Sequence, residues 1–180
     1  SDLLTRSKME AELRIRNAIE TDVEEIYRIH TEAIKKKCST RYGAEDVSAW
    51  VARQEKAKYL PFIVANEIIV AEIAQSRRVV GFGHLTADTG ADSDETADGK
   101  AMQIRGLFAD PDCVVKGVGT ALVKELENRA KKFGAVRVKV NSSLNAVEFY
   151  KKCGFFALDI TRHQISEQSC LQCQKMIKYL

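Results

Sequence analysis

The chain has 180 residues, of which 45% are hydrophobic and 29% are charged. This length fits one well-filled core and is too short for two ordinary domains, so we expect a single domain over 1–180 with its core at about 13–160. The net charge of +3, without a basic stripe interleaved with aromatic residues, gives no indication of a nucleic-acid partner. Because neither a secretory leader nor an apolar run of roughly 18 residues is present, we expect a soluble, cytoplasmic protein without a membrane partner.

The first third of the chain has the pattern of one strand followed by helices. Residues 1–11 are polar and aperiodic, and we expect them to form a loose start. Residues 13–16 alternate as a half-buried strand does. The segment 21–24 (Thr-Asp-Val-Glu) has the form of a capping box and precedes apolar residues at helical spacing, which predicts a helix over 22–37. A second helix is predicted over about 44–58.

From residue 68 onward the period changes to that of strands. Two β-rich runs, 68–74 and 79–85, are joined by four polar residues and predict a hairpin. Residues 87–100 are acidic and have no apolar period, which favours an exposed loop. A further strand is expected over 102–109, ended by Asp-Pro.

The remaining elements follow a glycine-rich turn. An amphipathic helix opens directly from this turn and is expected to end at Gly134, in a left-handed cap. The other predicted elements are a strand at 135–140, a short helix at 144–152 and two strands at about 155–163 and 170–178. The strand, helix and strand between residues 102 and 140 form a right-handed βαβ crossover, so we expect one sheet covered by helices.

The five cysteines are odd in number and irregularly spaced, which favours reduced thiols. Cys170 and Cys173 have the spacing of a metal-binding or redox pair. They fall on a predicted strand, however, where positions i and i+3 point to opposite faces. We therefore expect no metal site.

The glycine-rich turn at 115–120 (Val-Lys-Gly-Val-Gly-Thr) is a candidate phosphate site. A helix N-terminus exposes unpaired N–H groups and a partial positive charge, and glycines let a ligand approach the backbone closely. Lys116 adds a cation. The turn lacks the Gly-Lys-Ser/Thr ending of a P-loop and the third glycine of the dinucleotide fingerprint. A plain tight turn between strand and helix remains an alternative.

The segment 107–123 resembles the acetyl-CoA signature of the GNAT superfamily of N-acetyltransferases, in which Arg/Gln-x-x-Gly-x-Gly/Ala leads into a helix. Gly117 and Gly119 fit the two glycine positions. Val114 stands where the family usually has arginine or glutamine, and Val115 where a further glycine is common. The backbone cradle is unaffected by these departures, because every residue except proline supplies an N–H group.

The segment 138–155 is similar to the second signature of the family, Asn-x-x-Ala-x-x-x-Tyr followed by Gly-Phe. Ala146 and Tyr150 fit their positions, whereas Ser143 occupies the place of the usual asparagine and Asn145 lies two residues later. This variant is similar to one known branch of the superfamily. Two motifs in the correct order are more specific than either alone.

The resemblance implies a single α+β (α/β) domain with a twisted, mixed and mostly antiparallel sheet of six to seven strands, covered by about four helices. It also implies that the strands at 102–109 and 135–140 separate, leaving a gap for the pantetheine arm of acetyl-CoA. In this gap the amide of Phe108 or Ala109 would polarise the thioester carbonyl. The residues implied in cofactor binding are Leu107, Phe108, Ala109, Val114, Val115, Lys116, Gly117, Val118, Gly119, Thr120, Ser143, Asn145 and Tyr150.

Tyr150 matches the general acid of the family, whose phenol donates a proton to the departing thiolate. The alternative is that Phe149 and Tyr150 are both core aromatics. The base is less clear, because Gln103 and Arg105 stand where many relatives have a carboxylate. His84 has a suitable intrinsic pKa for a base acting through water, although a structural role is equally consistent with the sequence.

We therefore expect an N-acetyltransferase that moves an acetyl group from acetyl-CoA to a primary amine, without a metal. Two alternatives stay open: an acyl-CoA-binding sensor or scaffold without catalysis, and an unrelated phosphate-binding protein. The acidic loop at 88–98 could favour a cationic acceptor such as a polyamine, a lysine side chain or an aminoglycoside, although charge runs usually serve solubility. An exposed terminal strand could pair two subunits in a homodimer.

Overall fold

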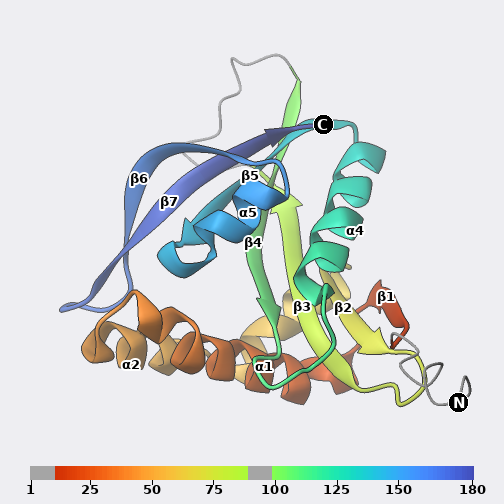
Figure 1. Cartoon of the computed structure of the whole chain (residues 1–180), viewed down its shortest axis with the longest axis horizontal. Coiled ribbons are helices and arrows are strands. Elements are labelled where there is room, and N and C mark those ends of the chain that lie inside the picture. Colours follow the sequence, from red (N-terminus) through yellow and green to blue (C-terminus); the bar gives the residue numbers. More distant parts are fainter. Residues whose placement is uncertain (1–10, 89–98) are drawn as a thin grey trace, which may run out of the picture.

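The structure, a computed structural model, describes residues 11–88 and 99–180 of the chain. The described residues form one seven-stranded sheet in the order β1-β2-β3-β4-β5-β7-β6 (Figure 1). The predicted loose start and most of the predicted acidic loop lie outside the described residues.

The strands are β1 (Leu13–Asn17), β2 (Ile68–Ile73), β3 (Val79–Ala87), β4 (Lys100–Ala109), β5 (Ala135–Ser143), β6 (Phe156–Gln164) and β7 (Cys170–Tyr179). The α-helices are α1 (Val23–Lys36), α2 (Ala44–Ala52), α3 (Leu60–Val64), α4 (Val118–Lys132) and α5 (Val147–Lys152). Short 3-10 turns are η1 (Glu20–Asp22), η2 (Cys38–Thr40), η3 (Lys56–Tyr59) and η4 (Leu144–Ala146). The predicted α+β architecture, with a mixed and mostly antiparallel sheet, is confirmed.

The helices cover the sheet on two sides. In Figure 1, α4 and α5 lie over the middle of one face, whereas α1 and α2 run along the end at which β4 stops. The two faces of β3 differ accordingly: the Phe82 side chain packs with Ile26 and Ile29 of α1, and the backbone of Gly81 and Gly83 faces α4. No helix among the described residues is long and apolar enough to cross a bilayer.

Glycines in β3 let α4 lie close to the sheet. A Cβ atom on Gly81 would stand 2.7 Å from Cγ1 of Val118, and one on Gly83 would stand 3.0 Å from Cδ1 of Leu126. A side chain at either position would push the helix away, so glycine in this strand marks a close approach. The start of α4 is thereby held near the end of β4.

The central strands separate as expected. The only parallel pairing in the described sheet joins Lys100–Ile104 of β4 to Ala135–Val140 of β5. Beyond this point β4 continues alongside β3, while the end of β5 pairs with β7. The far end of β4 therefore has an unpaired edge toward β5, and the separation begins after Ile104.

The segment after α2 differs from the prediction. The helix predicted over 44–58 ends at Ala52, and η3 and α3 follow it. Glu55 is extended (φ −135°, ψ 133°) and interrupts the helical path. Helix α3 was not predicted, although Pro61 in its first turn is a helix-start signal.

The predicted capping box at the start of α1 is also wrong. No side chain caps α1 directly. Instead, the buried carboxylate of Asp22 accepts a hydrogen bond from the Ile19 N–H (2.8 Å) and another from Arg16 (2.7 Å). A charged acceptor that also pairs with an arginine is stronger than a threonine hydroxyl, so Asp22 and not Thr21 fixes this turn.

Candidate functional site

A cleft of about 480 Å³ opens where β4 leaves β5. Its walls are the end of β4, the β4–α4 loop with the first turn of α4, the turn between β5 and α5, and the end of α1. These segments are distant in the chain and meet only because the two central strands separate.

One wall is the N-terminus of α4. Gly117 precedes the helix with φ of +83°, a left-handed conformation that glycine adopts without strain. The first N–H groups of an α-helix have no partner within the helix, so those at the start of α4 are available to a ligand. The first turn therefore presents backbone donors and the positive end of a helix dipole to the cleft.

Gly119 lies in the same turn but is needed for a different reason. A Cβ atom at this position would stand 3.0 and 3.1 Å from two ring carbons of Phe149. Because the position lacks a side chain, the Phe149 ring can lie against the first turn of α4. Gly119 and Phe149 thus set the width of the cleft between α4 and α5.

The opposite wall contains an unsatisfied polar atom. Oδ1 of Asn145 is buried without a hydrogen-bond partner, the only such side-chain atom in the described part of the chain. An unpaired buried acceptor costs roughly 1–3 kcal/mol, so this position indicates a donor supplied by a ligand. Nearby, burial raises the pKa of the Cys38 thiol to about 12, and hydrogen bonds that the side chains of Ser143 and Asn145 donate to the sulfur oppose this shift only in part.

The cleft brings together nine of the residues predicted to bind the cofactor: Leu107, Phe108, Ala109, Val115, Gly117, Val118, Gly119, Ser143 and Asn145. Val114, Lys116, Thr120 and Tyr150 are not among the residues that line it. Val114 is 92% exposed, so its departure from the family pattern removes no wall of the cleft. Phe149 lines the cleft without having been predicted, and so do Ala33 of α1, Lys37 directly after it and Cys38 of η2.

Tyr150 lies in the core directly behind this wall. Its side chain is 4% exposed, and its ring packs at 5.2 Å from the ring of Phe149 and 5.3 Å from that of Phe155. Burial raises its pKa well above the usual value, which keeps the phenol protonated. Of the two neighbouring aromatics, Phe149 is therefore the one that faces the cleft.

The two histidines of the central region are both held by partners. Nε2 of His84 lies 3.3 Å from a carboxylate oxygen of Glu67, and burial lowers the pKa of His84. Nδ1 of His30 lies 2.8 Å from the Tyr59 hydroxyl, and the centre of its ring lies 4.5 Å from that of Phe108, with the two rings tilted by 39°. Burial lowers the pKa of His30 to about 4, so this imidazole is neutral at neutral pH.

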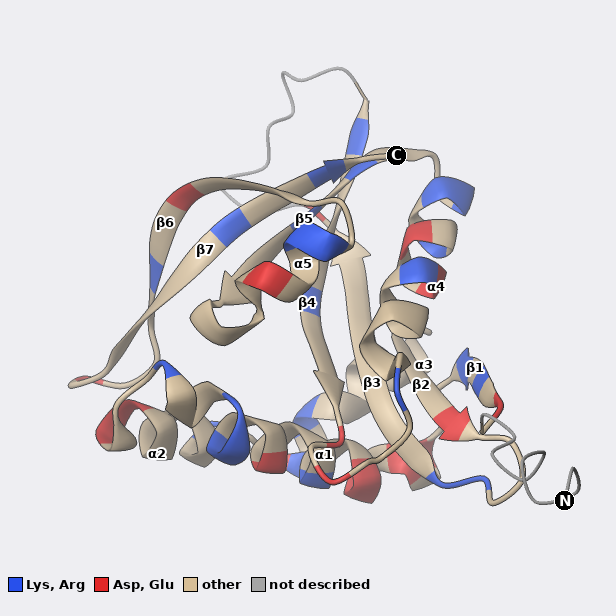
Figure 2. Ribbon diagram, in the orientation of Figure 1, with Lys and Arg blue, Asp and Glu red and all other residues tan. Residues whose placement is uncertain are grey.

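Ion pairs fix α1 against the β4–α4 loop. Arg28 donates to the fully buried carboxylate of Asp110 at 2.9 Å, and Lys36 donates to Asp112 at 2.9 Å. Elsewhere on the surface acidic and basic residues are mixed along the helices (Figure 2). The two pairs at the loop matter because they set the position of the end of α1 in the cleft.

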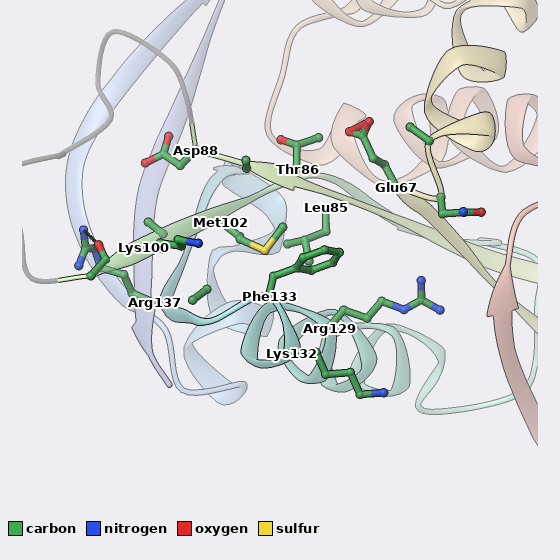
Figure 3. A pocket seen from close by; sticks show the side chains of 16 residues that line it. Glu67, Leu85, Thr86, Asp88, Lys100, Met102, Arg129, Lys132, Phe133 and Arg137 are labelled. Atoms are coloured by element: carbon green, nitrogen blue, oxygen red, sulfur yellow. Dashed lines mark hydrogen bonds between the residues drawn. The ribbon is translucent and has the colours of Figure 1, made fainter.

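A second cavity of about 780 Å³ lies at the opposite end of β3 and β4 (Figure 3). Its apolar wall includes Leu85, Met102 and Phe133, and the Phe133 side chain lies in the middle of the view. It shares no lining residue with the cleft. The three segments with predicted cofactor residues, 107–109, 114–120 and 143–150, all reach the cleft, and none of them lines this second cavity.

The family model of the acetyltransferase (GNAT) family matches residues 23–155 of the chain. This match covers more than half of the chain and includes the whole cleft. The chain belongs to the GNAT acetyltransferase family. The separated strands, the glycine turn and the β5–α5 turn are thus parts of a GNAT acyltransferase domain.

Solved structures agree with this assignment. A GCN5-related N-acetyltransferase from Rhodopseudomonas palustris is 26% identical, with a TM-score of 0.78, and the match covers 96% of this GNAT chain and 98% of the other. The PaiA N-acetyltransferase from Thermoplasma acidophilum, solved in complex with coenzyme A, is 21% identical with a TM-score of 0.72, over 94% and 99% of the two chains. The second likeness shows the fold alone.

A curated relative is similar over a shorter stretch. The uncharacterized protein YdhI of Bacillus subtilis (strain 168) is 40% identical over 63 residues, which is 33% of this GNAT chain and 38% of YdhI. The match thus spans less than half the length of that relative. No group of three or more His, Cys, Asp or Glu side chains in the described residues could hold a metal ion.

Proposed function

We propose that this protein is an N-acetyltransferase that moves an acetyl group from acetyl-CoA to a primary amine by direct transfer through a tetrahedral intermediate. The observation that carries the proposal is the cleft itself, which has a helix N-terminus on one wall and the unpaired Oδ1 of Asn145 on the other. The first suits a diphosphate and the second suits an amide N–H. The related PaiA structure is described as a complex with coenzyme A.

The residues of the cleft fit the two parts of acetyl-CoA, its diphosphate and its pantetheine arm. The N–H groups at the start of α4 would bind the diphosphate. The unpaired edge of β4 beyond Ile104 would pair with the amides of the pantetheine arm, as exposed strand edges do with extended ligands. Asn145 would accept one further N–H from the same arm.

The direction of the β4 backbone selects the amide that polarises the thioester. The Asp110 N–H donates to the carbonyl of Val80, on the β3 side. Successive N–H groups of an extended strand point to opposite sides, so the Ala109 N–H points into the gap and the Phe108 N–H toward β3. We therefore assign the polarising amide to Ala109, where it would stabilise the developing oxyanion.

Proton transfers complete the proposed reaction. The amine nitrogen attacks the carbonyl carbon and loses a proton, the C–S bond breaks, and Tyr150 donates its phenolic proton to the sulfur. Burial raises the pKa of Tyr150, so its phenol is protonated at neutral pH, and Tyr150 stays a prediction for this acid. An alkylamine has a pKa of about 10, so a base must act, and His84 through water stays a prediction for it.

A sensor or scaffold that binds acyl-CoA is the second candidate function. It is favoured by the absence of an available carboxylate in the described part of the cleft, where Asp110 is engaged by Arg28 and Arg78. Such a protein would keep the carrier site without using Tyr150 as an acid.

Calorimetry with CoA, followed by CoA release from acetyl-CoA with a panel of amines, tests the proposal. The panel should include polyamines, peptide lysines, aminoglycosides and amino acids. We expect CoA to bind and at least one amine to be acetylated. Binding without turnover across the whole panel would support the sensor, and the absence of CoA binding would remove both candidates.

We also propose that the protein pairs as a homodimer through β6. This strand is at the edge of the sheet, and Phe156, Leu158 and Ile160 are each about half exposed or more along it. Unpaired edge strands with apolar side chains favour pairing with another chain. Size-exclusion chromatography with light scattering should give the mass of two chains, and Leu158→Lys should shift it to one. A wild-type monomer would contradict the proposal.

A further inference from the structure

The cleft contains a cation that the family motif does not supply. Lys37, directly after α1, lines the cleft and is exposed to solvent. The ion pairs formed at this end of α1 belong to its neighbours: Lys35 and Lys36 pair with Glu32, and Lys36 also pairs with Asp112. Among the described residues no carboxylate pairs with Lys37, so its ammonium group is available to a ligand.

The positive charge that the sequence suggested for this site lies elsewhere. Lys116 is exposed and does not line the cleft, and Val114 has no polar group. The β4–α4 loop therefore offers backbone amides to the cleft but no cationic side chain. A doubly charged diphosphate held there would have only the partial positive charge of the α4 dipole opposite it, without a cationic side chain.

Two anchors hold Lys37 beside this loop. Its predecessor Lys36 is joined to Asp112 of the loop at 2.9 Å, and its successor Cys38 is buried at 1% exposure. A residue between two fixed neighbours has little freedom of its backbone. The Lys37 side chain thus starts from a defined point next to the loop that leads into α4.

We propose that Lys37 binds a phosphate group of the CoA carrier, taking over the role of the arginine or glutamine that the family has at the position of Val114. This inference rests on the proposed function. The phosphate lies between the α4 amides on one wall and the Lys37 ammonium on the other. An ammonium group forms charge-assisted hydrogen bonds with phosphate oxygens, and a flexible side chain can follow either phosphate.

Calorimetry on the full chain with two probes tests this assignment: CoA, and pantetheine, which has the same arm without phosphates. We expect Lys37→Ala to weaken CoA binding roughly tenfold, as for the loss of one charge-assisted hydrogen bond, and to leave pantetheine binding unchanged. Lys37→Arg should retain most of the CoA affinity. Lys35→Ala removes the same charge from the same helix end without touching the cleft, and should behave as wild type.

The salt dependence gives a second readout. CoA affinity of the wild type should fall with added NaCl more steeply than that of Lys37→Ala, because one screened charge contact is missing in the variant. Equal slopes would overturn the assignment.

The outcomes separate this inference from the proposed function. If the wild type binds CoA and Lys37→Ala binds it equally well, only the role of Lys37 is overturned. An equal loss of CoA and pantetheine binding in Lys37→Ala would show that Lys37 has a structural role. An effect confined to the KM of the amine would show that Lys37 contacts the acceptor amine and not the phosphate. If the wild type does not bind CoA, the proposed function fails first.

Discussion

Gly117 and Gly119 are two residues apart, yet each is required for a different physical reason. Gly117 has a left-handed backbone and no atom within 4 Å of an added Cβ, so only its conformation requires glycine. Gly119 has an ordinary helical position, and only the contact with Phe149 requires it. The motif therefore combines one requirement of the backbone with one of packing.

The two glycines should respond differently to alanine. We expect Gly117→Ala to destabilise the fold by about 1 kcal/mol through backbone strain, which thermal unfolding would show. Gly119→Ala should displace the Phe149 ring toward the cleft and lower CoA affinity severalfold with a smaller loss of stability. Unchanged CoA affinity in Gly119→Ala would mean that the ring can move without narrowing the cleft.

Tyr150 is the residue on which the chemistry of the proposal rests. Its hydroxyl forms no hydrogen bond with the described residues, so Tyr150→Phe should leave both folding and CoA affinity close to wild type. Turnover should fall by roughly 10²-fold or more, because a general acid contributes about that much. Stopped assays of CoA release at neutral pH would measure it, and wild-type turnover would exclude Tyr150 as the acid.

At the scale of elements, the ion pairs of Asp110 in the β4–α4 loop, with Arg28 of α1 and with Arg78, form a joint between α1 and the loop that shapes the cleft. Burial by itself would raise the pKa of Asp110, but hydrogen bonds from Arg28 and the Asp112 N–H, together with the charges of Arg28 and Arg78, lower it below the usual range. The Asp110 carboxylate is therefore charged, and its ion pair with Arg28 holds α1 against the β4–α4 loop. The same joint positions the end of α1.

Loss of this joint should be costly. Asp110→Asn should reduce the free energy of unfolding by about 2–3 kcal/mol, near the lower end for breaking a buried pair, because Arg28 is partly exposed. CoA affinity should fall with it, since the end of α1 loses its anchor. Asp112→Asn is the matched control: its pair with Lys36 is exposed, and we expect a change in stability below about 1 kcal/mol in urea unfolding. Equal effects of the two substitutions would contradict this account.

The elements themselves were largely predictable, because their signals are local. Helix α1 and the seven strands follow from the apolar period, and the left-handed Gly134 after α4 is confirmed with φ of +81°. Two local predictions were wrong where tertiary contacts outweighed them. The turn before α1 is fixed by Asp22 and not by Thr21, because Arg16 of the neighbouring strand pairs with Asp22. The helix that begins at Ala44 ends early because the chain turns to place α3 before β2.

For the molecule as a whole, stability should depend on pH through His30. Its pKa is lowered by burial from the ordinary 6.5 to about 4, so the unfolded chain binds a proton between these values and the folded chain does not. Stability is therefore fully present above pH 6.5 and is lost as the pH falls toward 4. The loss should be on the order of 3 kcal/mol, and the lowered pKa of His84 acts in the same direction.

Urea unfolding at several pH values would measure this effect. His30→Phe removes the titrating group and keeps a ring against Phe82 and Phe108, so its stability should vary less between pH 6.5 and 4 than that of the wild type. Parallel pH profiles of the two proteins would exclude His30 as the source.

The sequence by itself determined the family, the order of the strands and of most helices, and the glycine turn of the proposed carrier site, because glycine positions and apolar periods act over a few residues. It could not determine which side chains complete the cleft. Lys37 and the loop near Asp112 meet across some 76 residues of chain, as the bond from Lys36 to Asp112 shows. Similarly, Phe149 faces the cleft and Tyr150 the core because of how α5 packs on α4 and β6. Only the tertiary structure decided these positions, since the packing of distant segments depends on the whole core and not on any one stretch of sequence.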